Sequence, residues 1–237
     1  MKSRYAFLIA FWLFLSLQAE AQQSNFVKRY INKLVNDTTD VSRPQFLIYP
    51  TLAYAPETSW EIGLSTLYVY YAKNDTANRL SEINGFTFFT LQNQYGLWLD
   101  HALYSDKSRW FALGRLRLQS FPLHYHGIGP QTPPDYLALV EASQIQLRER
   151  LLRRIKPNLY LGPQLDFQRL SAVRFKPNTD GQLELPVGSE GATNIGIGAG
   201  LVYDNRHNVL NVRHGLFSEL ALYRYDKRWG SDYQFTT

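Results

Sequence analysis

From residue 44 to the end of the sequence, polar and apolar residues repeatedly alternate with a period of two. The segment 156–168 shows this clearly, with Gln164 and Asp166 at even positions and Leu165 between them. Successive side chains of a β-strand point to opposite faces, so this period predicts strands with one polar and one apolar face. The pattern therefore favours an all-β, antiparallel fold over residues 44–237.

About ten strands are expected, most of them near the ten residues that a tilted strand needs to cross a membrane. Their expected ranges are 45–54, 60–72, 81–91, 94–104, 109–120, 137–152, 156–170, 194–204, 215–226 and 231–237. The segments that join them are uneven in length: 105–108 is short, whereas 121–136 and 171–193 are long. Outer-membrane barrels have short periplasmic turns and longer external loops. We therefore predict a transmembrane β-barrel domain whose long connections, after the fifth and seventh strands, lie outside the cell.

The first 21 residues have the composition of an export signal. Lys2 and Arg4 precede an apolar run over 5–17, and a small-Glu-small motif ends at Ala21. This order is typical of a secretory signal peptide that is cleaved after Ala21. The alternative is a membrane anchor, but the apolar run is shorter than a helix needs to cross a bilayer. We therefore predict export, with the mature chain beginning at Gln22.

Residues 22–43 form a short leader before the alternating region. Its apolar residues recur at helical spacing and are Phe26, Val27, Tyr30, Ile31, Leu34 and Val35. This spacing predicts an amphipathic helix that turn-forming residues end before Pro44. Two interpretations remain open: a helix that packs on the rest of the protein, and a periplasmic plug or interfacial helix.

Composition excludes several kinds of chemistry. The chain has no cysteine, so disulfides, thiol catalysis and zinc–thiolate sites are excluded. The formal net charge of +5 could indicate a nucleic-acid partner. Export argues against it, and the arginines fall on alternating strand positions rather than in one block. No nucleic-acid partner is predicted.

A dense polar patch interrupts the alternation between residues 204 and 214, and its members are Asp204, Arg206, His207, Asn208, Asn211, Arg213 and His214. A metal site is disfavoured because the two histidines are seven residues apart with no nearby Cys or Glu. Catalysis is disfavoured because no nucleophile motif accompanies the patch. The remaining interpretation is a structured turn, in which Asp and Asn side chains cap backbone groups and Gly215 supplies a positive φ. No catalytic, cofactor-binding or metal-binding residue is predicted, and the protein is not expected to be an enzyme.

A second polar set is expected on the polar face of the strands. It comprises Arg115, Arg117, Arg148, Arg150, Gln164 and Asp166. These side chains either solvate the interior of a barrel or line a selective ion path. His124 and His126 alternate near a loop and give only a weak metal signal. Asp100 and His101 are adjacent, so they are expected on opposite faces.

The patch and three other motifs resemble the bacterial surface-antigen family, which supplies the barrel domain of BamA/TamA-type outer-membrane assembly proteins. YDNRHNVLNVRHGLFSELAL (203–222) is similar to that family's D-x-R-x-N turn, with Asp204, Arg206, Asn208 and Gly215 at the matching positions. Val212 stands where the family usually has proline. Similar segments are IYPTLAYAPETSWEIG (48–63), YHGIGP (125–130) and GSDYQF (230–235).

The sequence also departs from the family. Residues 22–43 are too short for a POTRA domain, no Arg-Gly pair is present, and the chain ends in QFTT without a terminal aromatic residue. Family barrels resemble a sixteen-strand closure. We therefore expect a POTRA-less barrel that is incomplete, a shorter closed barrel being the alternative.

The resemblance implies a role in inserting or translocating outer-membrane proteins or lipids, in the bacterial outer membrane and without covalent chemistry. The expected partners are outer-membrane lipid, client outer-membrane proteins and periplasmic chaperones. Two alternatives stay open: a passive pore or structural barrel, and an exported soluble β-sandwich.

Overall fold

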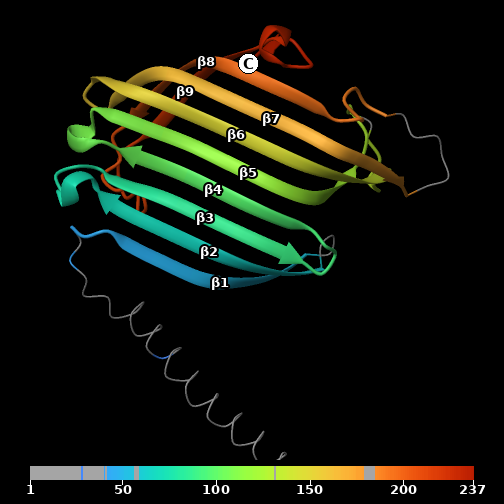
Figure 1. Ribbon diagram of the computed structural model, residues 1–237, viewed down its shortest axis with the longest axis horizontal. Coiled ribbons are helices and arrows are strands. Elements are labelled where there is room, and N and C mark those ends of the chain that lie inside the picture. Colours follow the sequence, from blue (N-terminus) through green and yellow to red (C-terminus); the bar gives the residue numbers. More distant parts are fainter. Residues whose placement is uncertain (1–27, 29–39, 41, 56–58, 131, 179–184) are drawn as a thin grey trace, which may run out of the picture. The chain divides into compact units, whose positions relative to one another are not determined.

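In the computed structural model, residues 42–237 form an antiparallel sheet in which each strand pairs with its neighbours in sequence (Figure 1). The described residues are 28, 40, 42–55, 59–130, 132–178 and 185–237. Residues 1–41 are a separate unit. The predicted signal peptide, its cleavage site at Ala21 and nearly all of the predicted leader 22–43 lie outside the described residues.

The sheet has ten strands within the described residues, and their order is β1 to β10 without a crossover. Their bounds are β1 Gln45–Ala55, β2 Ser59–Tyr71, β3 Leu80–Thr90, β4 Tyr95–Tyr104, β5 Trp110–Tyr125, β6 Ala138–Lys156, β7 Leu159–Pro177, β8 Ala192–Asp204, β9 Phe217–Tyr225 and β10 Phe235–Thr236. Short 3-10 turns are η1 Ala72–Asn74, η2 Asp106–Ser108 and η3 Lys227–Trp229. This confirms the predicted all-β, antiparallel fold. The sheet is open, because β1 and β10 are its two edges among these strands.

The strand register assigns the side chains of the sheet to two faces. Asp166 of β7 lies opposite Arg148 of β6, and its neighbour Leu165 lies opposite Ile197 of β8. We call the face that carries Asp166 the concave face, because side chains from distant strands meet across it. The face that carries Leu165 is the convex face.

The two faces have the reverse of a soluble protein's polarity. On the concave face Asp166 is 0% exposed and Arg150 is 8% exposed, whereas on the convex face Ile197 is 49% and Leu220 is 71% exposed. The curl of the sheet produces this burial, since it turns β8 and β9 back toward the concave side of β4 to β6 (Figure 1). The clearest sign is that the Tyr104 hydroxyl of β4 donates to Asp204 of β8 at 2.6 Å.

A small apolar cluster also lies on the concave face. Its buried members are Ala102, Tyr104, Phe111, Leu152, Tyr160 and Val202. The rings of Tyr104 and Phe111 stack with centroids 4.3 Å apart, and Tyr160 packs against Phe111 at 5.4 Å. Such aromatic pairs add about 0.5–1.5 kcal/mol beyond the burial of their area. The cluster therefore joins β4, β5, β6, β7 and β8 at one end of the sheet.

The two ends of the strands differ. The turn end carries the connections that follow β2, β4, β6 and β8, and the loop end carries those that follow β3, β5, β7 and β9. At the loop end β5 and β7 extend to Tyr125 and Pro177, beyond the predicted ends at 120 and 170. Both extensions pair with β6, so part of each predicted long loop is strand.

The last predicted strand, 231–237, is wrong in extent. Only Phe235–Thr236 forms a strand, β10. Ser231 and Asp232 bind instead to the first residues of β8: the Ser231 hydroxyl accepts from Ile195 N–H at 2.7 Å, and the Asp232 carboxylate accepts from Thr193 N–H at 2.6 Å. These bonds satisfy β8 backbone groups that lie beyond its pairing with β9, which begins at Gly196.

Candidate functional site

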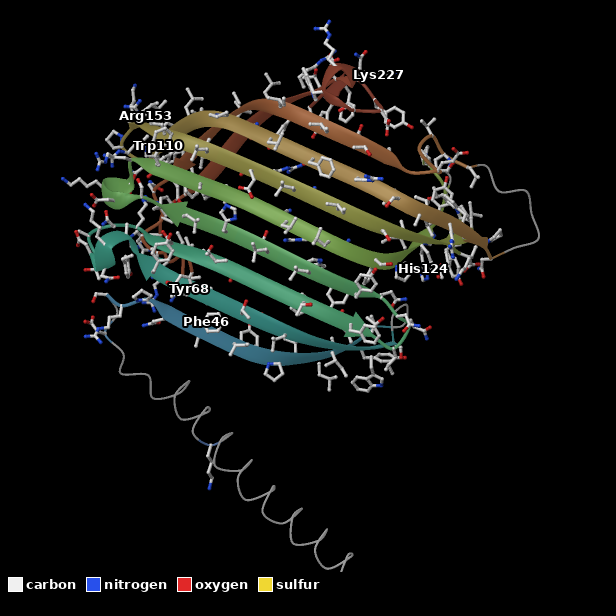
Figure 2. All side chains as sticks on the ribbon, in the orientation of Figure 1. Phe46, Tyr68, Trp110, His124, Arg153 and Lys227 are labelled. Atoms are coloured by element: carbon white, nitrogen blue, oxygen red, sulfur yellow. The ribbon has the colours of Figure 1, made fainter. Side chains whose placement is uncertain are left out.

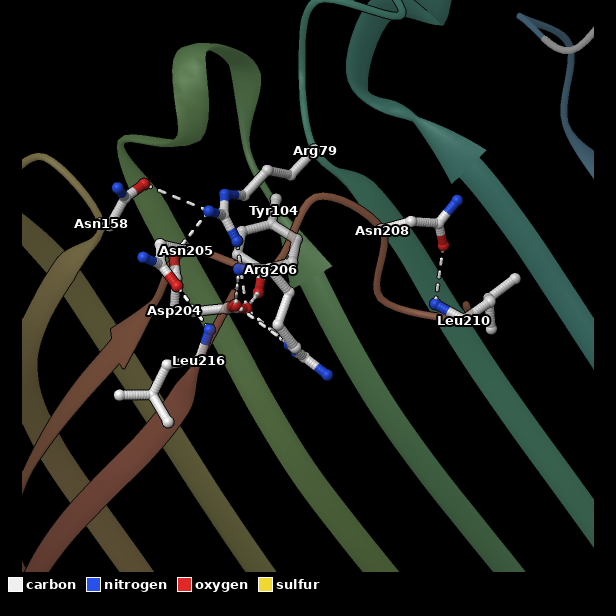
Figure 3. Close-up of polar contacts among 9 residues, drawn as sticks. All are labelled: Arg79, Tyr104, Asn158, Asp204, Asn205, Arg206, Asn208, Leu210 and Leu216. Atoms are coloured by element: carbon white, nitrogen blue, oxygen red, sulfur yellow. Dashed lines mark hydrogen bonds and ion pairs between the residues drawn. The ribbon is translucent and has the colours of Figure 1, made fainter. Parts of the chain in front are cut away.

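The strongest polar cluster in the described part of the chain lies at the turn end and is centred on Asp204, the last residue of β8. Its carboxylate is completely buried. Because consecutive antiparallel strands return to the same edge at every second turn, segments far apart in sequence meet here. We call the cluster of Arg79, Tyr104, Asn158, Asp204 and Arg206 the Asp204 hub (Figure 3).

Arg206 supplies most of the donors to Asp204. Its backbone N–H and its Nε both donate to Oδ1, at 3.1 and 3.0 Å, and its Nη2 donates to Oδ2 at 3.0 Å. The guanidinium also lies over the Phe217 ring, 4.6 Å from the centroid. These hydrogen bonds with Asp204 raise the pKa of Arg206 above its ordinary value, so the pair stays ionised.

Arg79 joins the hub from the segment just before β3. Its Nη1 forms an ion pair with Asp204 Oδ2 at 3.1 Å, and its Nη2 donates to the Asp204 carbonyl at 2.5 Å. The same Nη2 donates to Asn158 Oδ1 in the β6–β7 turn at 3.1 Å. Asp204 N–H in turn donates to the Asn158 carbonyl at 2.8 Å. One arginine therefore links the β2–β3, β6–β7 and β8–β9 connections.

The turn after Asp204 has its own internal bonds. Asn205 pairs with Leu216, its N–H donating to the Leu216 carbonyl at 3.1 Å and its Oδ1 accepting from Leu216 N–H at 2.5 Å. Gly215 has a φ of 104°, and a Cβ there would lie 2.6 Å from Arg206 Cα. Only glycine fits without strain, because both the conformation and the space exclude a side chain.

Asn208 belongs to the turn but not to the hub. Its Oδ1 accepts from the N–H group of Leu210 at 2.8 Å (Figure 3) and from that of Asn211 at 3.1 Å, which is an Asx-type turn. Of the four predicted turn residues, the structure thus brings Asp204, Arg206 and Gly215 together and places Asn208 at a separate local bend. Val212 is exposed at the tip.

The geometry of the hub leaves Asp204 no free lone pair for chemistry. Its two oxygens accept hydrogen bonds from Tyr104 and Arg206 and form an ion pair with Arg79, and no part of it is exposed to solvent. A carboxylate in this state cannot take up a proton from a substrate or coordinate a metal ion. Within the described residues, no group of three or more metal-ligating side chains is present. The chemistry that the hub performs is therefore cross-linking of the turn end.

The histidines lie apart from the hub. His207 and His214 stack on each other with ring centroids 4.2 Å apart. His124 stacks on Tyr136, and His126 contacts the Pro133 carbonyl, so the structure does not bring this pair onto one shared ligand position. Each imidazole has an explanation in local packing.

The predicted polar set lies on the concave face and forms ion pairs there. Asp100 accepts from Arg115 at 3.3 Å and from Arg117 at 2.6 Å. A second pair joins Arg148 to Asp166 at 2.7 Å. Arg150 forms an ion pair with Glu219 at 2.5 Å. The Gln164 side chain donates to the Ala199 carbonyl at 2.8 Å.

Asp100 and His101 point to opposite faces, as the alternation predicted. His101 lies on the convex face, where its Nε2 is 3.2 Å from Glu149 Oε2. Gly114 lies between them in the register, and a Cβ there would be 2.3 Å from both side chains. Glu149 is an acidic residue on the otherwise largely apolar convex face of β6, and its pairing with His101 accounts for its place.

Sequence reasoning missed the partners of Asp204. Arg79, Tyr104 and Asn158 lie 125, 100 and 46 residues before it, in segments with no recognisable motif. The only signal that points to them is that each lies at the turn end of its strand.

Comparison with known proteins adds no relative: no family model matches the chain, and neither the curated proteins nor the solved structures contain a significant match. Over the described ranges, none of the helices combines the length and the apolar character needed to cross a membrane.

Proposed function

We propose that residues 44–237 form part of the wall of a β-barrel in the bacterial outer membrane, with the convex face toward lipid and the concave face toward water. The reversed polarity of the two faces carries this proposal. A soluble sheet buries its apolar face, whereas here Leu220 and Ile197 are exposed and Asp166 and Arg150 are buried. Lipid-facing apolar residues that alternate with polar lumen residues are the pattern of a transmembrane barrel.

Aromatic residues at both ends of the convex face support the same placement. At the turn end they include Phe46, Tyr68 and Trp110, on β1, β2 and β5 (Figure 2). At the loop end Tyr54 and Trp60 pack edge to face, with ring centroids 5.5 Å apart. Tyr and Trp favour the two membrane–water interfaces, so two such girdles fit the borders of a membrane-embedded band.

The interface at the turn end also carries charge. Arg153 of β6 lies over the Trp110 ring, 5.9 Å from its centroid (Figure 2). A guanidinium on an interfacial aromatic ring keeps its charge in the headgroup region while its stem covers apolar surface. This is the arrangement expected where a lipid-facing strand leaves the hydrocarbon layer.

The open edges set a physical requirement on the proposal. β1 and β10 present unpaired backbone groups in the described sheet. In hydrocarbon each unpaired group costs several kcal/mol. The proposal therefore requires that both edges be paired with further strands in the membrane.

Within this barrel, we assign the protein a non-covalent role in inserting or translocating outer-membrane proteins or lipids, which is what its resemblance to surface antigens implies. The Asp204 hub fits this role as a brace. It links three turns at one end of the wall and so fixes their positions relative to one another.

A passive pore is the second candidate, and the charged concave face favours it. Arg115 is half exposed on that face and Asp100 lies beside it. Charged groups on the inner wall of a barrel are typical of a water-filled channel. A pore and an insertion factor share the same wall and differ in what crosses it.

Reconstitution of the full-length protein in lipid vesicles separates the two roles. An insertion factor accelerates the folding of an added client barrel and shows little steady conductance in a planar bilayer. A passive pore conducts without accelerating the client. Recovery of the protein from aqueous buffer as a folded monomer without detergent would overturn the membrane placement itself.

A further inference from the structure

We infer that a cavity on the concave face is a selective site for small zwitterionic solutes, which carry one positive and one negative group. The inference deepens the pore candidate and rests on the proposed membrane barrel. It is carried by the arrangement of charge around one cavity of about 340 Å³. The charged and polar concave-face residues that line it are Glu82, Asn84, Asp100, Arg115, Arg148, Arg150 and Glu219.

The charges around the cavity are sorted by strand. Arg115, Arg148 and Arg150 come from β5 and β6 and form a basic stripe. On one side of it β3 and β4 contribute Glu82 and Asp100. Asp100 joins the two stripes through its 3.3 Å ion pair with Arg115, and Glu219 of β9 pairs with Arg150 from the other side. The sorted charges create an electric field across the cavity rather than a potential of one sign.

The basic stripe has a structural cost. Arg115 and Arg148 are direct cross-strand partners on one face. Like charges in that relation destabilise a sheet. The carboxylates of Asp100 and Asp166 offset the repulsion from either side. A local arrangement that opposes stability and needs such compensation is expected where function demands it.

The accessible charges are those a solute would meet. The Arg115 side chain is 52% exposed, Asp100 is 41% and Arg148 is 31%. Arg150 is held in the wall by Glu219. The acidic and basic members facing the cavity are equal in number, so an ion of one sign is attracted by one stripe and repelled by the other. A zwitterion satisfies both at once by aligning with the field.

The test is solute efflux from vesicles that contain the full-length protein, using four polyols of similar size. These are neutral sorbitol, anionic gluconate, cationic N-methylglucamine and zwitterionic glucosaminate, with the membrane potential clamped by K⁺ and valinomycin. Glucosaminate is expected to leave faster than either ion by about tenfold, the lower range of what focused fields give.

Two variants give opposite signatures. Arg115→Gln leaves Asp100 paired with Arg117 and should speed the cation relative to the anion. Glu82→Gln should do the reverse. Arg169→Gln is the matched control, because it makes the same charge change on the convex face, opposite Thr193. Its solute ranking should equal that of the wild type.

Equal efflux of all four solutes from the wild type would overturn this inference alone, as would an unchanged ranking in both concave-face variants. A protein that is not recovered in the vesicle membrane would overturn the proposed barrel, and the inference with it.

Discussion

The two ends of the sheet are held together by different means. At the turn end a single buried carboxylate, Asp204, binds side chains from β4 and from two connections. At the loop end the extended β5–β7 strands rely on ladder pairing, on aromatic packing such as that of Phe121 against Phe88, and on exposed contacts such as the Lys176–Glu141 pair. A buried hub couples distant segments, whereas exposed pairs act one at a time. The turn end should therefore be sensitive to single substitutions that the loop end tolerates.

The largest expected effect is that of Asp204→Ala. It leaves the guanidinium groups of Arg79 and Arg206 without their carboxylate, and breaking a buried charge pair costs about 3–5 kcal/mol. Glu141→Ala at the loop end removes an exposed pair and should cost at most about 1 kcal/mol. The two variants are compared by the yield of folded protein and by the heat-induced shift in gel mobility that marks a folded barrel.

Arg206→Ala should act in the same direction but less strongly, because Tyr104 and Arg79 still bind Asp204. Wild-type yield and heat-modifiability in both hub variants would refute the bracing role. A loss of some catalytic turnover with normal folding would equally contradict it.

Gly215→Ala should rank next. A Cβ there would lie 2.6 Å from Arg206 Cα and from the Asn205 carbonyl, and the φ of 104° is strained for alanine. Gly129 at the loop end has a φ of 111° but nothing within 4 Å of its virtual Cβ. A strained backbone position costs about 1–3 kcal/mol of the free energy of unfolding. We expect Gly215→Ala to lie toward the upper figure and Gly129→Ala toward the lower one. Equal unfolding midpoints in urea would show that the close approach to Arg206 adds nothing.

Tyr104→Phe isolates one hydrogen bond of the hub. It removes the 2.6 Å bond to Asp204 and keeps the stacking on Phe111. The expected loss is about 1–2 kcal/mol, typical of a hydrogen bond to a charged group. Tyr125→Phe at the loop end is the control, since its ring packs on Phe175, and it should stay within about 0.5 kcal/mol of wild type. A larger loss in the control would invert the comparison.

The smallest expected effect is a pH dependence at the rim of the turn end. The hydrogen bond from Lys73 lowers the pKa of Asp106 below its ordinary value. A carboxyl group whose pKa is lowered in the folded state stabilises that state at pH values above the ordinary aspartate pKa. This contribution is lost as the pH falls through the folded-state pKa. Asp106→Asn should therefore unfold earlier than wild type in urea at neutral pH and converge with it in acid. A pH-independent difference would argue against the ionic contribution.

Local sequence patterns predicted the strands and their faces well, but they misplaced the ends of β5 and β7. The period of two places Gln164 and Asp166 on one face of β7 because it depends only on backbone geometry. The same pattern missed the ends of β5 and β7, since pairing with β6 extends both strands into segments that contain Pro122 and Pro177. Proline and glycine near a strand end look like a loop in sequence.

The Asp204 hub was predicted only in part from the sequence. Asp204, Arg206 and Gly215 are close in the chain, and their residue types predict a structured turn. Tyr104 and Arg79 carry no such signal, because the curl of the whole sheet brings them to Asp204. Contacts that depend on the summed twist of several strands cannot be inferred from a local window.

The orientation of the two faces is the central claim, and the absence of native cysteine makes it directly measurable. Single cysteines at Leu97 and Leu220 on the convex face and at Arg115 on the concave face would be treated with a membrane-impermeant maleimide. Labelling is compared before and after denaturation of the protein in lipid vesicles. We predict that Arg115→Cys is labelled in both states and that Leu97→Cys and Leu220→Cys are labelled only after denaturation. Full labelling of the two convex-face cysteines in intact vesicles would contradict a lipid-facing convex surface.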